Sequence, residues 1–154
     1  MGLSSMGLLR TIVDCFEELN KAIVDTGVKK SLRARARNMA ADIYYQGVAY
    51  TIAVCAARSR REAVEWGLFS EGGEDIVKGV SKYIAHEDRE GLSYAIYGAT
   101  ILYLLKQLGF FEKAKSLEEV LREALEKAHL INERAGQVAL WIKRLAEASF
   151  PVEE

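Results

Sequence analysis

Proline is almost absent from this chain of 154 residues, and the single one, Pro151, stands near the end of the sequence. Because proline interrupts helices, its absence before position 151 permits long continuous helices. Cysteine is also scarce. Cys15 and Cys55 both lie in apolar helical patterns, so we expect two reduced, buried thiols. Nothing in the sequence suggests the export that a disulfide would require.

No hydrophobic run is long enough to cross a membrane. The most apolar window, residues 92–105, has about 14 residues, whereas a membrane span needs roughly 20. Residues 1–8 lack the basic start and the sustained apolar run of a signal peptide. We therefore expect a soluble, cytoplasmic protein with no membrane partner.

Motifs for catalysis or cofactor binding are few. Gly72-Gly73 lacks the following Lys and Ser or Thr of a phosphate-binding loop. His86, Glu87 and Asp88 are adjacent, so their side chains point in different directions, which is unsuited to a metal site. We interpret Glu87 or Asp88 as the N-terminal residue of a helix. We expect no catalytic residue, no cofactor and no metal.

Helical periodicity runs through most of the chain, and no stretch alternates as a strand would. We predict an all-α single-domain helical bundle over residues 1–154, with about five to six helices and a frayed tail at residues 150–154. The loop at residues 71–74 is the clearest break, and residues 62–69 either extend the second helix or form a short separate one. The predicted helices cover residues 5–26, with Gly27 as a C-terminal cap, and then residues 31–60, 75–85, 89–108 and 116–149.

Two of these helices carry a long heptad-like seam. In the last helix Ser116 and Glu119 form a capping box, and many seam positions are alanine, which implies that another helix approaches closely. Gly47, Gly98 and Gly136 inside helical patterns have the same interpretation. The seams are Leu32, Ala36, Met39, Ile43, Tyr50, Val54 and Ala57 in the second helix and Leu117, Leu121, Ala124, Ala128, Ile131, Ala135, Val138, Ile142 and Leu145 in the last.

Positive charge is concentrated in one part of the chain. Residues 27–61 hold eight Lys or Arg residues and a single acid, Asp42, whereas the whole chain has a net charge of −1. Such asymmetry suggests a polyanionic partner. The eight cations are Lys29, Lys30, Arg33, Arg35, Arg37, Arg58, Arg60 and Arg61.

A helical wheel tests whether these charges converge. At about 100° per residue, Lys29, Lys30, Arg33 and Arg37 share one edge of the second helix. Tyr44 and Arg58 fall on the same edge if the helix continues through Gly47. Arg35 and Arg60 point away from it, at about 200° and 180° from Arg33.

A basic edge of this kind suits a phosphate backbone, because each cation displaces condensed counterions. Tyr44 could stack on an unpaired base, and Arg60 and Arg61 add charge where the helix ends. Nothing indicates that the edge reads a base sequence. Alternatively, the arginines pair with acids of the last helix, or the chain is a small adaptor bundle that binds an acidic protein.

Two segments resemble the small α-helical subunit of the type III-B CRISPR (Cmr) RNA-guided effector complex. Residues 45–54, Tyr-Gln-Gly-Val-Ala-Tyr-Thr-Ile-Ala-Val, are similar to that family's glycine-hydrophobic run within a long helix. Residues 140–146, Leu-Trp-Ile-Lys-Arg-Leu-Ala, match its aromatic residue followed by basic residues near the C-terminus. The resemblance spans roughly residues 30–148, and its motifs are loose.

The resemblance implies a non-catalytic structural subunit in antiviral defence. It would contact single-stranded or guide-paired RNA, other subunits of the complex and stacked copies of itself. Carried onto this sequence, the basic residues of the second helix and the pair Lys143-Arg144 are the candidates for RNA contact. The full candidate set is Lys29, Lys30, Arg33, Arg37, Tyr44, Arg58, Arg60, Arg61, Lys143 and Arg144.

One spacing favours an enzyme instead. Arg122 and His129 are seven residues apart, which resembles the ribonuclease motif of HEPN domains, themselves small helical bundles. On one continuous helix the two side chains would lie about 20° apart. The arginine would then stabilise phosphoryl charge while the histidine transfers a proton. Arg-to-His spacings like this one are also common by chance.

Overall fold

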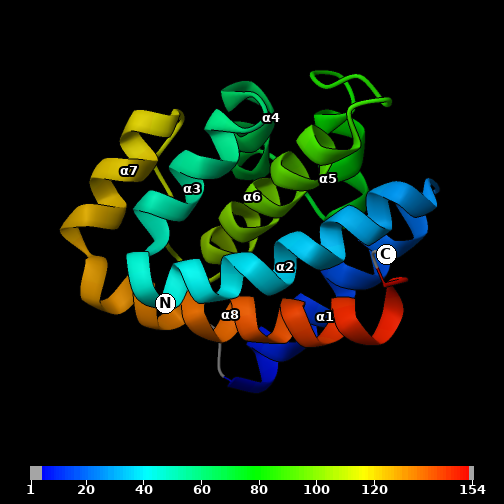
Figure 1. The fold of residues 1–154 in the computed structure, drawn as a ribbon. Helices are drawn as coiled ribbons and strands as arrows, with labels where there is room; N and C mark the ends of the chain where they lie inside the picture. The colour runs from blue at the N-terminus through cyan, green and yellow to red at the C-terminus, as the bar shows by residue number, and fades with distance from the viewer. Residues whose placement is uncertain (1–4, 153–154) are drawn as a thin grey trace.

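The computed structural model of the chain describes residues 5–152, and its fold is all-α, as predicted (Figure 1). The described part holds eight α-helices, one 3-10 helix and no strand. There are more helices than the five to six predicted, mainly because both long predicted helices are divided. The elements are α1 (Ser5–Ala22), α2 (Thr26–Gln46), α3 (Val48–Ala57), α4 (Arg61–Glu65), η1 (Trp66–Leu68), α5 (Gly73–Val80), α6 (Arg89–Gln107), α7 (Leu117–Glu126) and α8 (Ala128–Ser149).

Helix α6 is the central element of the bundle. Every residue from Gly91 to Leu102 is buried, which explains why this window is the most apolar of the chain. Asp88 caps its N-terminus by accepting the Gly91 N–H at 2.9 Å, and Gly109, with φ at +100°, follows its last turn. The bounds predicted from the sequence differ from the observed ones by a single residue.

The first interhelical connection differs from the prediction. Helix α1 ends at Ala22, and Gly27 belongs to the first turn of α2 rather than to a cap of α1. Asp25 begins α2, because its carboxylate accepts the Gly27 N–H at 2.7 Å. That N–H, and secondarily Arg89, lower the pKa of Asp25. The basic helix therefore starts five residues earlier than predicted.

Gly47 divides the second predicted helix into α2 and α3. Its φ of +89° and ψ of 170° define a backbone conformation that residues other than glycine rarely adopt. The freed N–H of Val48 donates to Asn132 of α8 at 2.9 Å. As a result the predicted seam is buried from Leu32 to Ile43, and after the break only Val54 of its predicted members packs, partly buried, against the core. Beyond the break Tyr50 is 52% exposed, and α3 instead buries Val48, Thr51, Ile52, Cys55 and Ala56.

The last predicted helix is likewise two helices, α7 and α8, which meet at Lys127. Half of the predicted capping box forms. Ser116 accepts the Glu119 N–H at 3.3 Å, while the Glu119 carboxylate accepts the N–H of Lys115 rather than that of Ser116. The seam of α8 is buried at Ile131, Ala135, Val138 and Ile142, as predicted.

Helices approach closely at only one of the three glycines noted in the sequence. A Cβ at Gly98 would lie 2.9 Å from the Cβ of Cys55, so α6 and α3 are in close contact there. A Cβ at Gly136 would have no neighbour within 4 Å, and Gly47 is a break rather than a packing site. Cys15 and Cys55 are free and buried, as expected, and burial raises the pKa of each thiol to about 12.

The chain ends and the short segments show smaller differences. Residues 62–69 form the separate helices α4 and η1, and α5 stops at Val80 rather than Ala85. Phe150, the first residue of the predicted frayed tail, is buried against Phe16, with ring centroids 5.0 Å apart. Residues 1–4 and 153–154, which belong to the predicted start and tail, lie outside the described part.

We expect Gly47→Ala to destabilise the fold by about 1–3 kcal/mol, because alanine disfavours this backbone conformation. The matched control is Gly136→Ala in α8, where the space is open and alanine favours the helix by up to about 1 kcal/mol. Urea unfolding followed by circular dichroism measures both. Equal stability of the two variants would contradict the role assigned to Gly47.

Candidate nucleic-acid interface

Helices α2 and α8 lie side by side and antiparallel (Figure 1). Asn132 meets the α2–α3 junction, and the backbone oxygen of Glu147 accepts a long hydrogen bond of 3.5 Å from Arg33. This register places Arg37 at about the level of Lys143 along the pair. The two basic segments singled out in the sequence, which are more than 100 residues apart, therefore lie on neighbouring helices.

Three of the ten candidate residues have acidic partners. Arg60 pairs with Glu62 at 3.5 Å, and Arg144 pairs with Glu147 at 3.0 Å. Arg61 binds both carboxylate oxygens of Glu118 on α7, and its Nη2 also lies 3.3 Å from Glu65. Arg61, through Glu118, pairs with an acid of the predicted last helix, as the alternative above stated, whereas Arg60 pairs with Glu62 of α4 and Arg144 pairs within α8.

The pair of Arg61 and Glu118 affects both groups. The hydrogen bonds that Arg61 donates to Glu118, and to a smaller extent those to Glu65, raise the pKa of Arg61. The same guanidinium lowers the pKa of Glu118 to about 2. Arg61 thus joins α4 to α7, away from the edge of α2, and its charge is largely neutralised by two carboxylates.

The other candidate cations form no ion pair among residues 5–152. Lys29, Lys30, Arg33 and Lys143 are half-buried, so their apolar stems pack on the helices. Arg37 and Arg58 are exposed. We define the α2–α8 edge as those of the ten candidate cations that lie on these two helices and have no acidic partner: Lys29, Lys30, Arg33, Arg37 and Lys143.

Arg58 does not join this edge. The wheel placed it beside Arg33 on the assumption that the helix continues through Gly47, and the break there invalidates that placement. The Arg58 guanidinium carbon instead lies 6.0 Å from the ring centroid of Tyr94 on α6. Arg35, which appeared to point away, lies over the same ring at 4.5 Å. The sequence pattern of α2 held no signal for this convergence.

Tyr44 is 77% exposed and stands against Tyr45, with the ring centroids 4.9 Å apart. It borders a groove of about 520 Å³ between α2 and α8. The side chain is therefore accessible for stacking, as the sequence predicts. The groove is lined by Ala40, Ile43, Tyr44, Asn132, Glu133, Gly136, Gln137 and Leu140.

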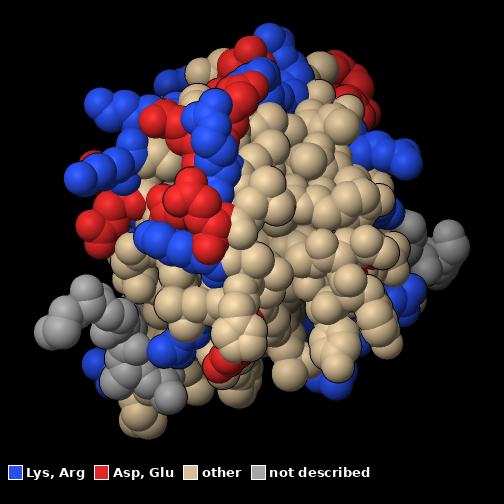
Figure 2. Space-filling view, turned by 90° about the vertical axis from the view of Figure 1, so that its left-hand side faces the viewer, with Lys and Arg blue, Asp and Glu red and all other residues tan. Residues whose placement is uncertain are grey.

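Charge is unevenly distributed over the surface. Figure 2 shows the left-hand side of Figure 1, where charged side chains gather at the upper left and a wide central area has almost none. In the sequence, Asp42 is the only charged residue between Arg37 and Arg58. Tyr45, 79% exposed, and Tyr50, 52% exposed, belong to this stretch. We call these two exposed tyrosines, with the exposed Gln46 between them, the uncharged face.

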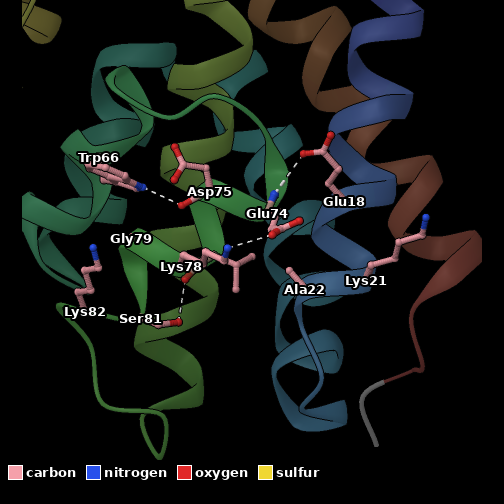
Figure 3. A pocket seen from close by; sticks show the side chains of 11 residues that line it. Glu18, Lys21, Ala22, Trp66, Glu74, Asp75, Lys78, Gly79, Ser81 and Lys82 are labelled. Carbon is pink, nitrogen blue, oxygen red and sulfur yellow. Dashed lines mark hydrogen bonds and ion pairs between the residues drawn. The ribbon is translucent and has the colours of Figure 1, made fainter.

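A cavity of about 980 Å³ lies between α1 and α5 and is separate from the α2–α8 edge (Figure 3). Its charges are mixed and partly paired, since Lys78 bonds Glu74 at 3.0 Å and Glu18 accepts the Glu74 N–H. Trp66 forms one wall and donates to the Asp75 carbonyl oxygen at 2.8 Å. The cavity brings none of the candidate residues together.

Arg122 and His129 lie on different helices, because the chain breaks at Lys127 between them. Both side chains are exposed, and a shallow pocket beside Arg122 is lined by Glu119, Glu123 and Glu126 without His129. The geometric reason for pairing them, a single continuous helix, is therefore absent. Within residues 5–152 no group of three or more metal-ligating side chains occurs, and no helix has the length and apolarity to cross a membrane.

Comparison with known proteins gives a match to a solved structure. That structure is a cryo-EM structure of the type III-B Cmr-beta complex bound to non-cognate target RNA, and one of its chains is similar to this protein. The TM-score is 0.69 at 22% sequence identity, over 95% of this chain and 97% of that chain. The two chains share a fold. No protein-family model and no curated protein sequence matches.

This match confirms, at the level of the fold, the resemblance to a Cmr subunit that the sequence suggested. It extends that resemblance to the first helix, which had no distinguishing residues. The match covers nearly the whole of both chains.

We expect Arg61→Gln to return the pKa of Glu118 from about 2 toward its ordinary value of 4.5. Since the lowered value reflects stabilisation of the folded state, that stabilisation is present above pH 4.5 and is lost as the pH falls toward 2. Carboxyl NMR titration measures the change. Arg122→Gln is the control and should move the pKa of Glu118 much less, because Arg122 acts on that carboxylate only through its charge and less strongly than Arg61 does.

Proposed function

We propose that this chain is a non-catalytic, cytoplasmic subunit of a type III-B RNA-guided effector complex in antiviral defence. The observation that carries the proposal is the fold shared, over nearly the whole length of both chains, with a chain of an RNA-bound Cmr complex. In this role the chain contacts the RNA backbone and packs against other subunits and copies of itself.

The RNA-contacting role is supported by the α2–α8 edge. Its five cations lack acidic partners, so their charge is available to a polyanion. Each cation that meets a phosphate releases condensed counterions, which makes the contact strong at low salt and independent of base sequence. Arg60, Arg61 and Arg144 would contribute less, because their charges are already compensated. Tyr44 adds stacking on an unpaired base, worth about 1–3 kcal/mol.

The uncharged face supports the subunit role. A surface without cations does not attract RNA, whereas exposed tyrosines are typical of protein interfaces. The chain therefore divides its surface between a basic edge suited to RNA and an uncharged face suited to protein. An isolated nucleic-acid binder would need no such face.

Two alternatives remain testable. A ribonuclease would use Arg122 and His129, which the break at Lys127 leaves on separate helices. An adaptor bundle would bind an acidic protein through the same basic edge and would bind no RNA. The experiment below distinguishes all three.

We expect Lys30→Gln/Arg33→Gln/Arg37→Gln to weaken binding of a labelled single-stranded RNA of about 40 nucleotides and to flatten its salt dependence. Losing three phosphate contacts lowers the slope of log K against log salt by about 2. Fluorescence anisotropy across a salt series measures it. The matched control, Arg60→Gln/Arg61→Gln/Arg144→Gln, removes the same charge from paired arginines and should change the slope little.

Equal losses in the two triple variants would contradict the assignment of the α2–α8 edge. Absence of RNA binding by the wild type alongside capture of an acidic protein would support the adaptor. RNA cleavage that Arg122→Ala or His129→Ala removes would overturn the non-catalytic role.

The uncharged face gives a separate expectation. Tyr45→Lys/Tyr50→Lys should reduce self-association, measured by sedimentation velocity over a concentration series, while leaving RNA affinity unchanged or slightly raised. Tyr83→Lys, at a tyrosine that is 37% exposed outside this face, is the control. Unchanged self-association in the double variant would contradict the role of the face in stacking.

A further inference from the structure

Two arginines converge on one aromatic ring outside the α2–α8 edge. The guanidinium carbon of Arg35, on α2, lies 4.5 Å from the ring centroid of Tyr94, and that of Arg58, at the end of α3, lies 6.0 Å from it. Arg35 also donates to the Tyr94 hydroxyl through Nη1. We call these three residues the Arg35–Arg58–Tyr94 cluster.

The fold builds this cluster from three helices. Helices α2 and α3 diverge from Gly47 like the arms of a V, and α6 passes between them (Figure 1). Tyr94 lies on α6, and its burial fixes the position of the ring. Arg35 approaches this ring from α2, and Arg58 approaches it from the end of α3. A straight helix through Gly47 would have separated the two arginines by more than 30 Å, at 1.5 Å for each of the intervening residues.

The charges of the cluster are uncompensated within residues 5–152. Neither Arg35 nor Arg58 has a carboxylate within 4.0 Å, in contrast with Arg60, Arg61 and Arg144. In addition, Nε of Arg35 is buried and has no hydrogen-bond partner. A buried donor on a charged group without an acceptor is rare and calls for an explanation.

Contact with the ring explains part of the arrangement, because a cation is attracted to the face of a tyrosine. It does not explain why a second guanidinium is held beside the same ring, since the two like charges repel each other. An anion that both arginines contact would remove the repulsion and would accept hydrogen bonds from guanidinium N–H groups that Tyr94 leaves unused. The planar fork of arginine matches the oxygens of a phosphate.

We propose that Arg35 and Arg58 bind a phosphate group of the RNA backbone, with Tyr94 as the positioning residue that orients Arg35. This inference rests on the proposed function, since the RNA is the source of the phosphate. It also indicates the direction in which an RNA strand would cross the protein. Helix α2 has cations on its α8 side and on its α3 side, so a strand that crosses α2 contacts both sets, whereas a strand along the α2–α8 edge contacts one.

The site is tested first with inorganic phosphate. In ¹⁵N-labelled protein, the Nε–H signal of Arg35 should shift on addition of sodium phosphate and not on addition of sodium chloride at the same ionic strength. The shift should be absent in Arg58→Gln. No phosphate-specific shift, or the same shift in Arg58→Gln, would overturn the site.

RNA binding then identifies the source of the phosphate. We expect Arg58→Gln to weaken single-stranded RNA binding by about fivefold to tenfold at low salt and to lower the salt slope by about 0.7, the effect of one lost phosphate contact. Arg61→Gln, with the same charge change at a paired arginine, should bind as the wild type does. Tyr94→Phe, which removes the hydroxyl partner of Arg35, should give a smaller loss.

Thermal melting separates this role from a merely structural one. Arg58 is exposed and lies beside a like charge, so Arg58→Gln should melt no lower than the wild type if the pair serves a ligand. A lower melting temperature together with unchanged RNA affinity would overturn the inference.

The two proposals fail in distinguishable ways. If Lys30→Gln/Arg33→Gln/Arg37→Gln weakens RNA binding and Arg58→Gln does not, the cluster is not an RNA site and the proposed function stands. If the wild type binds no RNA, the proposed function and RNA as the source are both overturned. A phosphate shift would then assign the cluster to free phosphate.

Discussion

The backbone turn at Gly47, and the hydrogen bond from Val48 N–H to Asn132 that accompanies it, determine how the rest of the chain is arranged. A helix that continued past this point would leave α6 without cover on one side. The turn redirects the chain so that α2 and α3 both pack on α6, and α6 becomes buried over most of its length. The same hydrogen bond fixes the register of α2 against α8, and with it the positions of Arg33 and Lys143.

Compensation of charge then decides which cations are available to a partner. The chain has nearly equal numbers of acidic and basic residues, yet they are not evenly paired. Acids on α4, α7 and α8 neutralise Arg60, Arg61 and Arg144, which therefore act as links between or along helices. No acids stand beside the α2–α8 edge or the Arg35–Arg58–Tyr94 cluster at ion-pair distance among the described residues. These unpaired cations are the basis of the proposed RNA contact.

The fold shared with a chain of a Cmr complex does not by itself assign a role to any of these residues. At 22% identity most side chains differ, so a shared backbone does not transfer individual RNA contacts. The case for each residue here rests on its own surroundings: whether it has an acidic partner, how exposed it is, and which helix presents it. By that criterion Lys30 and Arg37 are stronger candidates than Arg61, although the sequence ranked all three alike.

Local sequence determined the all-α class, the extent of α6 with its cap at Asp88, the burial of both cysteines and the concentration of positive charge, because each depends on neighbouring residues alone. Local sequence also placed Lys29, Lys30, Arg33 and Arg37 together, since they span little more than two turns of one helix. The break at Gly47, the pairing of Arg61 with Glu118 and the meeting of Arg35 with Arg58 were decided by the tertiary structure. Each depends on a partner from a distant part of the chain, such as Asn132, Glu118 or Tyr94. Helical periodicity holds no information about such partners, since the hydrogen bonds and packing that select them exist only once the helices have assembled.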